Sequence, residues 1–380
     1  MLAPEASTPA ARPPALLIVL SSLAAEGCPQ LALQLAGHWR RQGWRLEVLC
    51  LDGGARDLEP EFAALGVPLH WAGLGAGWMR YPRLLALSFR LCRHLHPRAV
   101  LCFPLGWHAL VAIGARLAGV TRTCAHVGNA PPVWTGRAFV KFRLWVQLGR
   151  PFTHRLLCCS RAIRQATIRD FGVRPRETRT IHNACDLQRF TPAARARAPY
   201  WRQPPRLGMV ARLEPHKDQP TLIRALALLR DQGLRPQLWL IGDGSQQARL
   251  TALVQSLGLG SQVRLLGSRR DIPELLAQLD LFVFAARPDE GFGIALAEAM
   301  AAGVPVVASN VPACHEVLAG GRCGLLVEPA SAPALAAGIQ AVLADLAGAR
   351  RRAASARRRA RRHFAIPAMA RAYAEELGLA

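Results

Sequence analysis

Short apolar runs alternate with helix-like segments along almost the whole of this 380-residue chain. Such alternation is typical of a parallel sheet with helices on both faces, because each strand needs a crossover before the next parallel strand begins. In the first half, the predicted strands are 15–20, 45–51, 99–103, 123–127, 155–159 and 178–181, and the predicted helices are 29–42, 82–95, 107–118, 136–148 and 162–171. The first half therefore predicts one doubly wound α/β domain.

The alternation starts again after 191–205, a stretch rich in proline, alanine and arginine that is typical of a linker. The predicted strands there are 207–210, 237–241, 263–266, 281–284, 304–308 and 324–327, and the predicted helices are 219–231, 245–256, 271–278, 293–302, 332–346, 350–362 and 366–377. The sequence thus predicts a loose leader at 1–14, two doubly wound domains at 15–190 and 206–362 with the linker between them, and a C-terminal helix within 363–380.

The chain is strongly basic, with 48 Lys and Arg against 25 Asp and Glu, a net charge of +23. The stretch 62–169 contains 15 of these cations and no acidic residue. A region of one charge attracts anions such as lipid headgroups, phosphorylated acceptors or nucleic acid. The alternative is GC-rich coding that scatters solvated arginines. Nucleic-acid binding would also need stacking aromatics or a groove-reading helix, and only 6% of the residues are aromatic.

The ten cysteines form no C-x-x-C pair and no zinc spacing. Several of them, such as Cys102, lie in apolar runs where cysteine acts as a small hydrophobe, which suits a reducing cytosol. The apolar run 15–20 is too short to span a membrane, its lead-in lacks a basic region, and no other run is long enough. These features predict a cytoplasmic protein.

The segment Asp289 to Glu298 joins a buried strand to an apolar helix through a glycine-rich turn flanked by carboxylates. Free backbone N–H groups at a helix start suit a phosphate group. Carboxylates do not hold phosphates, but they accept hydrogen bonds from hydroxyls. The segment therefore indicates a ligand that has both, a diphosphate flanked by sugars.

Two further strand–loop–helix segments fit the same ligand. Arg212 and Lys217 lie on the loop after strand 207–210, where their charges would neutralise a diphosphate, although solvated loop cations are the simpler interpretation. Gly242 and Gly244 follow the next strand and allow close approach of a ligand, or only close packing. Residues 73–77 read GLGAG and do not match G-x-G-x-x-G, and no P-loop motif occurs. The sequence therefore does not support a nicotinamide-dependent enzyme or a P-loop protein.

An ordered set of motifs over 155–327 resembles the retaining, GT4-like glycosyltransferases of the GT-B fold (glycosyltransferase group 1). Its members are E-x7-E at 290–298, the loop with Arg212 and Lys217, the turn at 240–244, the strand at 303–308, the segment 181–190 and the pair 159–160. The resemblance implies two Rossmann-like domains facing a central cleft. The domain 15–190 would bind the acceptor, the domain 206–362 would bind a nucleotide-sugar, and the C-terminal helix would pack back on the first domain.

The resemblance also implies residue roles. Glu298 would accept hydrogen bonds from the ribose hydroxyls, and Glu290 would hold hydroxyls of the donor sugar. Backbone N–H groups of Gly291, Phe292 and Gly293 would contact phosphate or sugar, and Gly242 and Gly244 would also line the donor site.

In the same family pattern, Arg212 and Lys217 would stabilise the charge on the departing diphosphate. The leaving phosphate itself would take the acceptor's proton, so no protein base and no metal or other cofactor is expected, and the chain has no D-x-D motif. His126 follows a strand where the family places a catalytic histidine near the sugar. A hydrogen-bonded histidine at a strand end is an equal alternative.

The chain departs from the family pattern where the acceptor is expected to bind. Residues 25–30 read AEGCPQ in place of the usual glycine pair, and Ala184 replaces a common glycine, so the acceptor is left open. The segment 78–95 is a basic amphipathic helix with nearby Trp and Tyr. It would lie in a membrane interface or, as we favour for the helix alone, cover a sheet. The acid-free region as a whole favours a peripheral contact with the inner face of the plasma membrane.

Together these observations predict a retaining hexosyltransferase that moves sugar from a nucleotide-diphospho-sugar to a lipid-linked or cell-surface glycan acceptor, in polysaccharide, lipopolysaccharide or glycolipid biosynthesis. The alternatives within the fold are a phosphorylase, an enzyme that makes a soluble glycoside, and a silent sugar sensor. From another class, a basic nucleic-acid-binding protein stays the rival, although we expect no nucleic-acid partner. The nucleotide base, the sugar, the linkage and the oligomeric state are left open.

Overall fold

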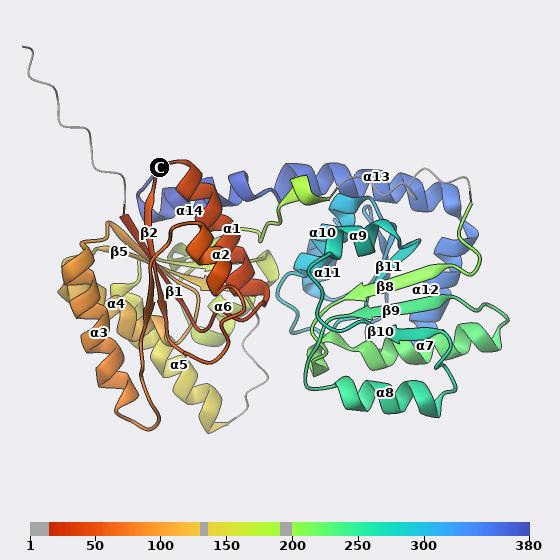
Figure 1. Cartoon of the computed structure of the whole chain (residues 1–380), viewed down its shortest axis with the longest axis horizontal. Helices are drawn as coiled ribbons and strands as arrows, with labels where there is room; N and C mark the ends of the chain where they lie inside the picture. The colour runs from red at the N-terminus through yellow and green to blue at the C-terminus, as the bar shows by residue number, and fades with distance from the viewer. Residues whose placement is uncertain (1–14, 130–135, 191–199) are drawn as a thin grey trace, which may run out of the picture. The chain divides into compact units, whose positions relative to one another are not determined.

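A computed structural model describes residues 15–129, 136–190 and 200–380 (Figure 1). The predicted leader and most of the predicted linker lie outside these residues. Contacts divide the chain into two compact units, one of Met1–His126, Leu148–Arg155 and Tyr373–Ala380, the other of Val127–Gln147 and Leu156–Ala372. The predicted domain boundaries follow the sheets, whereas these units follow the density of contacts, so the predicted division stays a prediction.

The first sheet has seven strands in the order β3-β2-β1-β4-β5-β6-β7. Its strands are β1 (Ala15–Leu20), β2 (Arg45–Cys50), β3 (Leu69–Trp71), β4 (Ala99–Cys102), β5 (Arg122–Val127), β6 (Arg155–Cys158) and β7 (Thr178–Thr180). Its helices are α1 (Gly27–Arg41), α2 (Glu59–Ala64), α3 (Arg80–Leu95), α4 (His108–Leu117), α5 (Arg137–Gly149) and α6 (Arg161–Phe171). Strand β1 pairs in parallel with β2 and β4, and its described side chains are all buried, as expected for a strand covered on both faces.

The second sheet has six strands in the order β10-β9-β8-β11-β12-β13. They are β8 (Arg206–Val210), β9 (Gln237–Ile241), β10 (Val263–Leu265), β11 (Leu281–Phe284), β12 (Val306–Ser309) and β13 (Leu325–Val327). Its helices are α7 (Gln219–Asp231), α8 (Gln247–Ser256), α9 (Ile272–Ala277), α10 (Ile294–Ala302), α11 (Pro312–Val317), α12 (Ala332–Ala344) and α13 (Leu346–His363). Helix α7 contacts α8 and α12, while α10 contacts α9, α11 and α13, so the helices form two groups about the sheet (Figure 1). The last helix, α14 (Ile366–Leu377), contacts the first sheet, because Tyr373 lies against His126 of β5 and Glu376 pairs with Arg155 of β6.

Both predicted α/β sheets are therefore present, and the differences from the predicted elements have local causes. Strand β3 and helices α2 and α11 are too short, at three to six residues, to produce a readable apolar period. The helix expected over 332–346 ends at Ala344, because the Asp345 carboxylate accepts the backbone N–H of Gly348 at 2.7 Å and so caps the next helix.

Helix α3 packs against helix α4. The contact is close because Gly114 has no side chain: a Cβ there would lie 2.8 Å from the Cβ of Ser88. The expectation that the basic segment 78–95 covers a sheet stays a prediction. Trp78 and Phe89 are left exposed. Among the described helices, none is by itself long and apolar enough to cross a membrane, and the pair α12 and α13 meets that test only together, with a 100° bend between them.

Candidate active site

Two predicted site loops lie at the carboxyl ends of neighbouring strands. Strand β8 leads into the loop that contains Arg212 and Lys217, and β11 leads into the turn that contains Glu290. The two strands pair in parallel, with Leu281 opposite Leu207. The strand order also reverses here, since the chain continues from β8 to β9 on one side and from β11 to β12 on the other. Open α/β sheets bind their ligands at such a switch point.

Lys217 and Glu290 form an ion pair across this switch point. The ammonium Nζ of Lys217 donates to Oε2 of Glu290 at 2.5 Å, and the two side chains are only 15% and 5% exposed. Burial by itself would raise the pKa of Glu290, but the charge and the hydrogen bond of Lys217 outweigh burial and hold that pKa below its usual value. The site therefore holds an ionised carboxylate and a cation in contact.

The loop that positions Lys217 is fixed by hydrogen bonds to the next crossover and to the start of helix α7. The N–H of Leu213 donates to the carbonyl of Asp243 at 2.8 Å, and the side-chain amide of Gln219 donates to the carbonyl of Arg212 at 2.7 Å. Pro215–Lys217 forms one 3-10 turn, which Asp218 ends with a left-handed backbone at φ 47°. Arg212 is exposed on this loop.

Gly242 and Gly244 hold that loop by allowing close backbone approach. A Cβ on Gly242 would overlap the carbonyl oxygen of Ala211, and one on Gly244 would lie 2.6 Å from the carbonyl oxygen of Leu213. Their φ values of 139° and 155° also favour glycine. Chain packing thus requires both glycines, and a contact with the donor stays a prediction for them.

The Gly-Phe-Gly turn after Glu290 is held from within. Phe292 is 1% exposed, and its ring packs edge-on against Phe364 with 5.3 Å between centroids. Its backbone N–H points to Oε1 of Glu290 at 3.4 Å, a long hydrogen bond that leaves this donor partly engaged. Gly293 takes a φ of 82° at the start of α10. The turn therefore orients the Glu290 carboxylate as well as opening a helix.

The carbonyl of Gly291 is tied to a different segment of the same unit. It accepts a hydrogen bond from the Ser160 hydroxyl at 2.9 Å, and a Cβ on Gly291 would overlap the carbonyl of Gly128. Ser160 also caps α6 by accepting the N–H of Ile163 at 3.1 Å. Only glycine fits at position 291.

Glu298, the second acid of the motif, lies on α10 with part of its side chain open to solvent. Burial of its carboxyl group raises the pKa to about 7, and the nearby charge of Arg189 opposes this only in part. At neutral pH, Glu298 is therefore divided between the acid and the carboxylate.

His126 lies at the end of β5 and is fully buried. Its Nδ1 is 2.7 Å from the hydroxyl of Tyr373, and its ring packs against Phe103. Burial lowers its pKa to about 4, so the imidazole is neutral at physiological pH. Within the described residues, its Nε2 has no hydrogen-bond partner. The surroundings are those of a hydrogen-bonded strand-end histidine, and a contact with the sugar stays a prediction.

Sequence reasoning missed two residues near the site. His216 lies beside the ion pair, and its pKa is lowered by burial and then by the charges of Lys217 and Arg212, against the opposing charges of Glu290 and Asp289. Arg189 supplies the cation near Glu298. His216 could have been found from the sequence, because it directly precedes the predicted residue Lys217. No feature of the sequence pointed to Arg189. In the part of the chain described, no group of three His, Cys, Asp or Glu side chains is placed to hold a metal ion.

This fold and site define a class of protein with two parallel-sheet domains, the GT-B class. The chain resembles the crystal structure of Anabaena Alr3699/HepE in complex with UDP and glucose, with a TM-score of 0.82, 24% identity, and coverage of 96% of this chain and 99% of the other. Residues 195–361 match the family of glycosyl transferases group 1, and residues 26–189 match Glycosyltransferase Family 4. The chain belongs to these group 1 and family 4 glycosyltransferases.

Curated relatives agree with this assignment over part of their length. The glycogen synthase of Mycobacterium tuberculosis is 34% identical over 222 residues, 58% of this chain and 53% of that protein. The UDP-Gal:alpha-D-GlcNAc-diphosphoundecaprenol alpha-1,3-galactosyltransferase of Escherichia coli is 29% identical over 227 residues, 57% of this chain and 58% of that protein. The chain thus spans little more than half the length of these relatives.

Proposed function

We propose that this protein transfers a hexosyl group from a nucleotide-diphospho-sugar to a lipid-linked or cell-surface glycan acceptor, with retention at the anomeric carbon. The observation that carries the proposal is the buried Lys217–Glu290 pair at the switch point between β8 and β11. A cation there meets a diphosphate, while an ionised acid beside it accepts hydrogen bonds from sugar hydroxyls. A diphospho-sugar has both groups next to each other.

In the proposed reaction, the acceptor oxygen bonds to the anomeric carbon on the face from which the diphosphate leaves. The carbon–oxygen bond to the diphosphate breaks, and a leaving phosphate oxygen takes the proton of the acceptor hydroxyl. Lys217 and Arg212 stabilise the charge that grows on this leaving group. Glu290 positions the sugar through its hydroxyls, and Glu298 accepts hydrogen bonds from the ribose. None of these steps needs a protein base or a metal.

A panel of intact nucleotide-sugars tests the donor. UDP, GDP and ADP, each alone and with its sugar, are compared by thermal shift, because a ligand that binds only the folded protein raises its melting temperature. The complexes of HepE with UDP and with UDP-glucose make uridine donors the first to test. We expect one nucleotide series to stabilise the protein and Lys217→Ala to abolish that shift. No stabilisation by any member contradicts the proposal.

The acceptor is tested with radiolabelled donor and two acceptor pools, a membrane extract and soluble sugars. Transfer to a lipid-extractable product supports the lipid-linked acceptor, in line with the diphosphoundecaprenol-linked substrate that the Escherichia coli relative is named for. Transfer only to soluble sugars favours a soluble glycoside or glucan, the kind of product that the glycogen synthase name indicates. Analysis of the anomeric configuration of the product decides between retention and inversion.

An anionic membrane surface at the cytoplasmic face is the proposed partner, and helix α5 supports it. Val140, Leu144 and Leu148 repeat at helical spacing along one side of α5 and are 55%, 64% and 48% exposed. Arg137 and Lys141, both exposed, lie on the same side. The region 62–169 has no acidic residue to repel lipid headgroups. An exposed apolar stripe flanked by cations is typical of helices that lie in a membrane interface.

Vesicle sedimentation tests this partner. We expect binding to vesicles with phosphatidylglycerol and little binding to phosphatidylcholine alone, because the contact depends on charge. The triple variant Val140→Ser, Lys141→Glu, Leu144→Ser should lose binding, while Leu117→Ser, at a residue 65% exposed on α4, should keep it. Equal sedimentation of both variants would exclude α5 as the docking surface.

A further inference from the structure

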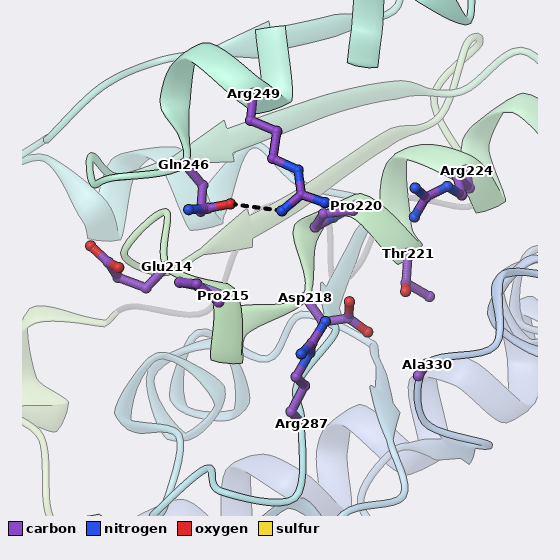
Figure 2. A pocket seen from close by; sticks show the side chains of 10 residues that line it. All are labelled: Glu214, Pro215, Asp218, Pro220, Thr221, Arg224, Gln246, Arg249, Arg287 and Ala330. Atoms are coloured by element: carbon purple, nitrogen blue, oxygen red, sulfur yellow. Dashed lines mark hydrogen bonds between the residues drawn. The ribbon is translucent and has the colours of Figure 1, made fainter. Parts of the chain in front are cut away.

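A pocket lies beside the Lys217 loop, in the unit that contains the second sheet. Its volume is about 260 Å³, and it is lined by the loop after β8, the first turns of α7 and α8, the segment after β11 and Ala330 (Figure 2). The side chains of Arg212, Lys217, Glu290 and Glu298 do not line it. The pocket is therefore separate from the proposed donor site.

Three arginines from three different crossovers line this pocket. Arg224 comes from α7, Arg249 from α8 and Arg287 from the segment after β11, and Figure 2 shows them on different walls. Within the described residues, none of the three forms an ion pair with a carboxylate; the one side-chain hydrogen bond among them joins Arg249 to the neutral amide of Gln246 at 3.4 Å. Three guanidinium groups outnumber the two carboxylates of the pocket and, in the described ranges, make no ion pair with either, which favours an anion, and arginine pairs with phosphate through two parallel hydrogen bonds.

Two acids also line the pocket, and they differ in their bonding. Glu214 is engaged, since it accepts the hydroxyl of Ser245 at 2.8 Å and the backbone N–H of Ser245 at 3.1 Å. Asp218 is 3% exposed, and among the residues described its Oδ2 has no hydrogen-bond partner. An unpaired buried carboxylate oxygen is costly and calls for a donor. A ligand hydroxyl meets that need beside the arginines.

The size of the pocket limits the ligand. A cavity of about 260 Å³ is small for a ligand site, since such pockets usually have about 300–1,000 Å³. This size suits a phosphorylated monosaccharide better than a whole nucleotide-sugar. The first turn of α7, whose Pro220 and Thr221 line the pocket, adds the partial positive charge of a helix start.

We propose that this pocket binds a phosphorylated sugar or polyol, with the phosphate on Arg224, Arg249 and Arg287 and a hydroxyl on Asp218. The pocket walls join the catalytic loops directly, because Asp218 follows Lys217 in the chain and the N–H of Glu290 donates to the carbonyl of Arg287 at 3.0 Å. The N–H of Arg287 also donates to the carbonyl of His216 at 3.0 Å. A ligand here therefore stiffens both loops of the ion pair and raises turnover, a regulatory effect that rests on the proposed transfer activity.

Binding is tested first, without any transfer reaction. Glucose 1-phosphate, inorganic phosphate and glucose are titrated into the full chain by calorimetry. Glucose 1-phosphate should bind more tightly than phosphate, and glucose should not bind. Arg224→Ala and Arg249→Ala should each weaken binding by about tenfold or more, since each removes a charge-assisted hydrogen bond to the phosphate. Arg264→Ala, an exposed arginine on β10 outside the pocket, should leave binding unchanged.

Two further measurements identify the pocket. Asp218→Asn should reduce the preference for glucose 1-phosphate over phosphate and keep phosphate binding, because only the hydroxyl acceptor is altered. Titration with the nucleotide present should leave glucose 1-phosphate affinity unchanged or raised. Competition with the nucleotide would place the ligand in the donor site and overturn the proposal. The proposal would also be overturned if the wild type did not bind glucose 1-phosphate, or if both arginine variants bound it with wild-type affinity. Binding without an effect on transfer would overturn only the regulatory part, and absent transfer with intact binding would count against the proposed function instead.

Discussion

Donor binding should weaken as the pH falls below 7, because Glu298 accepts hydrogen bonds from ribose most strongly as a carboxylate. Burial raises the pKa of this group to about 7, so near neutral pH about half of the free molecules have it protonated. Hydroxyl donors stabilise the ionised form and lower the pKa in the complex. The complex therefore binds fewer protons than the free protein, and its affinity must rise with pH across this range.

The size of the effect follows from that pKa. If only the carboxylate binds, the dissociation constant is multiplied by about 1.1 at pH 8, about 2 at pH 7 and about 11 at pH 6. His216 and Glu290 do not reproduce this loss of affinity at low pH. Protonation of His216 would add a positive charge and so favour the anionic donor as the pH falls. Burial and the charge of Lys217 lower the pKa of His216, and Lys217 holds the pKa of Glu290 below its usual value. Glu290 therefore stays a carboxylate to lower pH than an ordinary glutamate.

Calorimetric titration of an intact nucleotide-sugar between pH 6 and 8 measures this profile. The matched control is Glu298→Gln, which keeps the shape of the side chain and cannot ionise, so its affinity should not depend on pH. The reasoning is refuted if wild-type affinity is flat over this range, or if Glu298→Gln keeps the wild-type slope.

Three other outcomes are expected. Lys217→Met should lower the free energy of unfolding at pH 7 by about 3–5 kcal/mol, because Glu290 is left buried and unpaired. In urea unfolding, the double variant Lys217→Met, Glu290→Gln should recover much of this stability, while transfer stays lost. Equal stability of the wild type and both variants would contradict this. Gly242→Ala should cost about 1–3 kcal/mol and lower turnover by displacing the Arg212 loop, whereas Gly260→Ala, which meets no atom within 4 Å, should be neutral in both assays. Tyr373→Phe should cost about 1–3 kcal/mol in unfolding without changing donor affinity, because it removes the buried partner of His126 Nδ1; lower donor affinity would instead favour a contact between His126 and the sugar.

The sequence predicted those parts of the site that depend on local pattern. Lys217 and Glu290 could each be placed on a loop after a strand, because strand, turn and helix leave a contiguous signal. Their ion pair could not be predicted, since it depends on β8 pairing with β11, and the sheet order is set by contacts between residues far apart in the chain.

Burial and chain packing explain why other features of the site could not be predicted from the sequence. The raised pKa of Glu298 comes from side chains that close around α10, which no spacing of residues reveals. Gly242 and Gly244 signalled a close approach, but the sequence did not show that the approaching group is the chain's own backbone. Arg224, Arg249 and Arg287 belong to no common motif and line one pocket because their crossovers follow the neighbouring strands β8, β9 and β11.

Phe364, between α13 and α14, makes the tail of the chain a support for the chemistry. Its ring meets Phe292 edge-on, and the His182 ring lies 5.8 Å from it, while Glu316 accepts from His182 at 2.6 Å. A protein cut after His363 would keep every acid and base of the proposed site. It would lose the Phe364 ring that packs against Phe292 of the Gly-Phe-Gly turn. C-terminally shortened forms of the protein should therefore retain Phe364, because without it the turn that orients Glu290 loses its support.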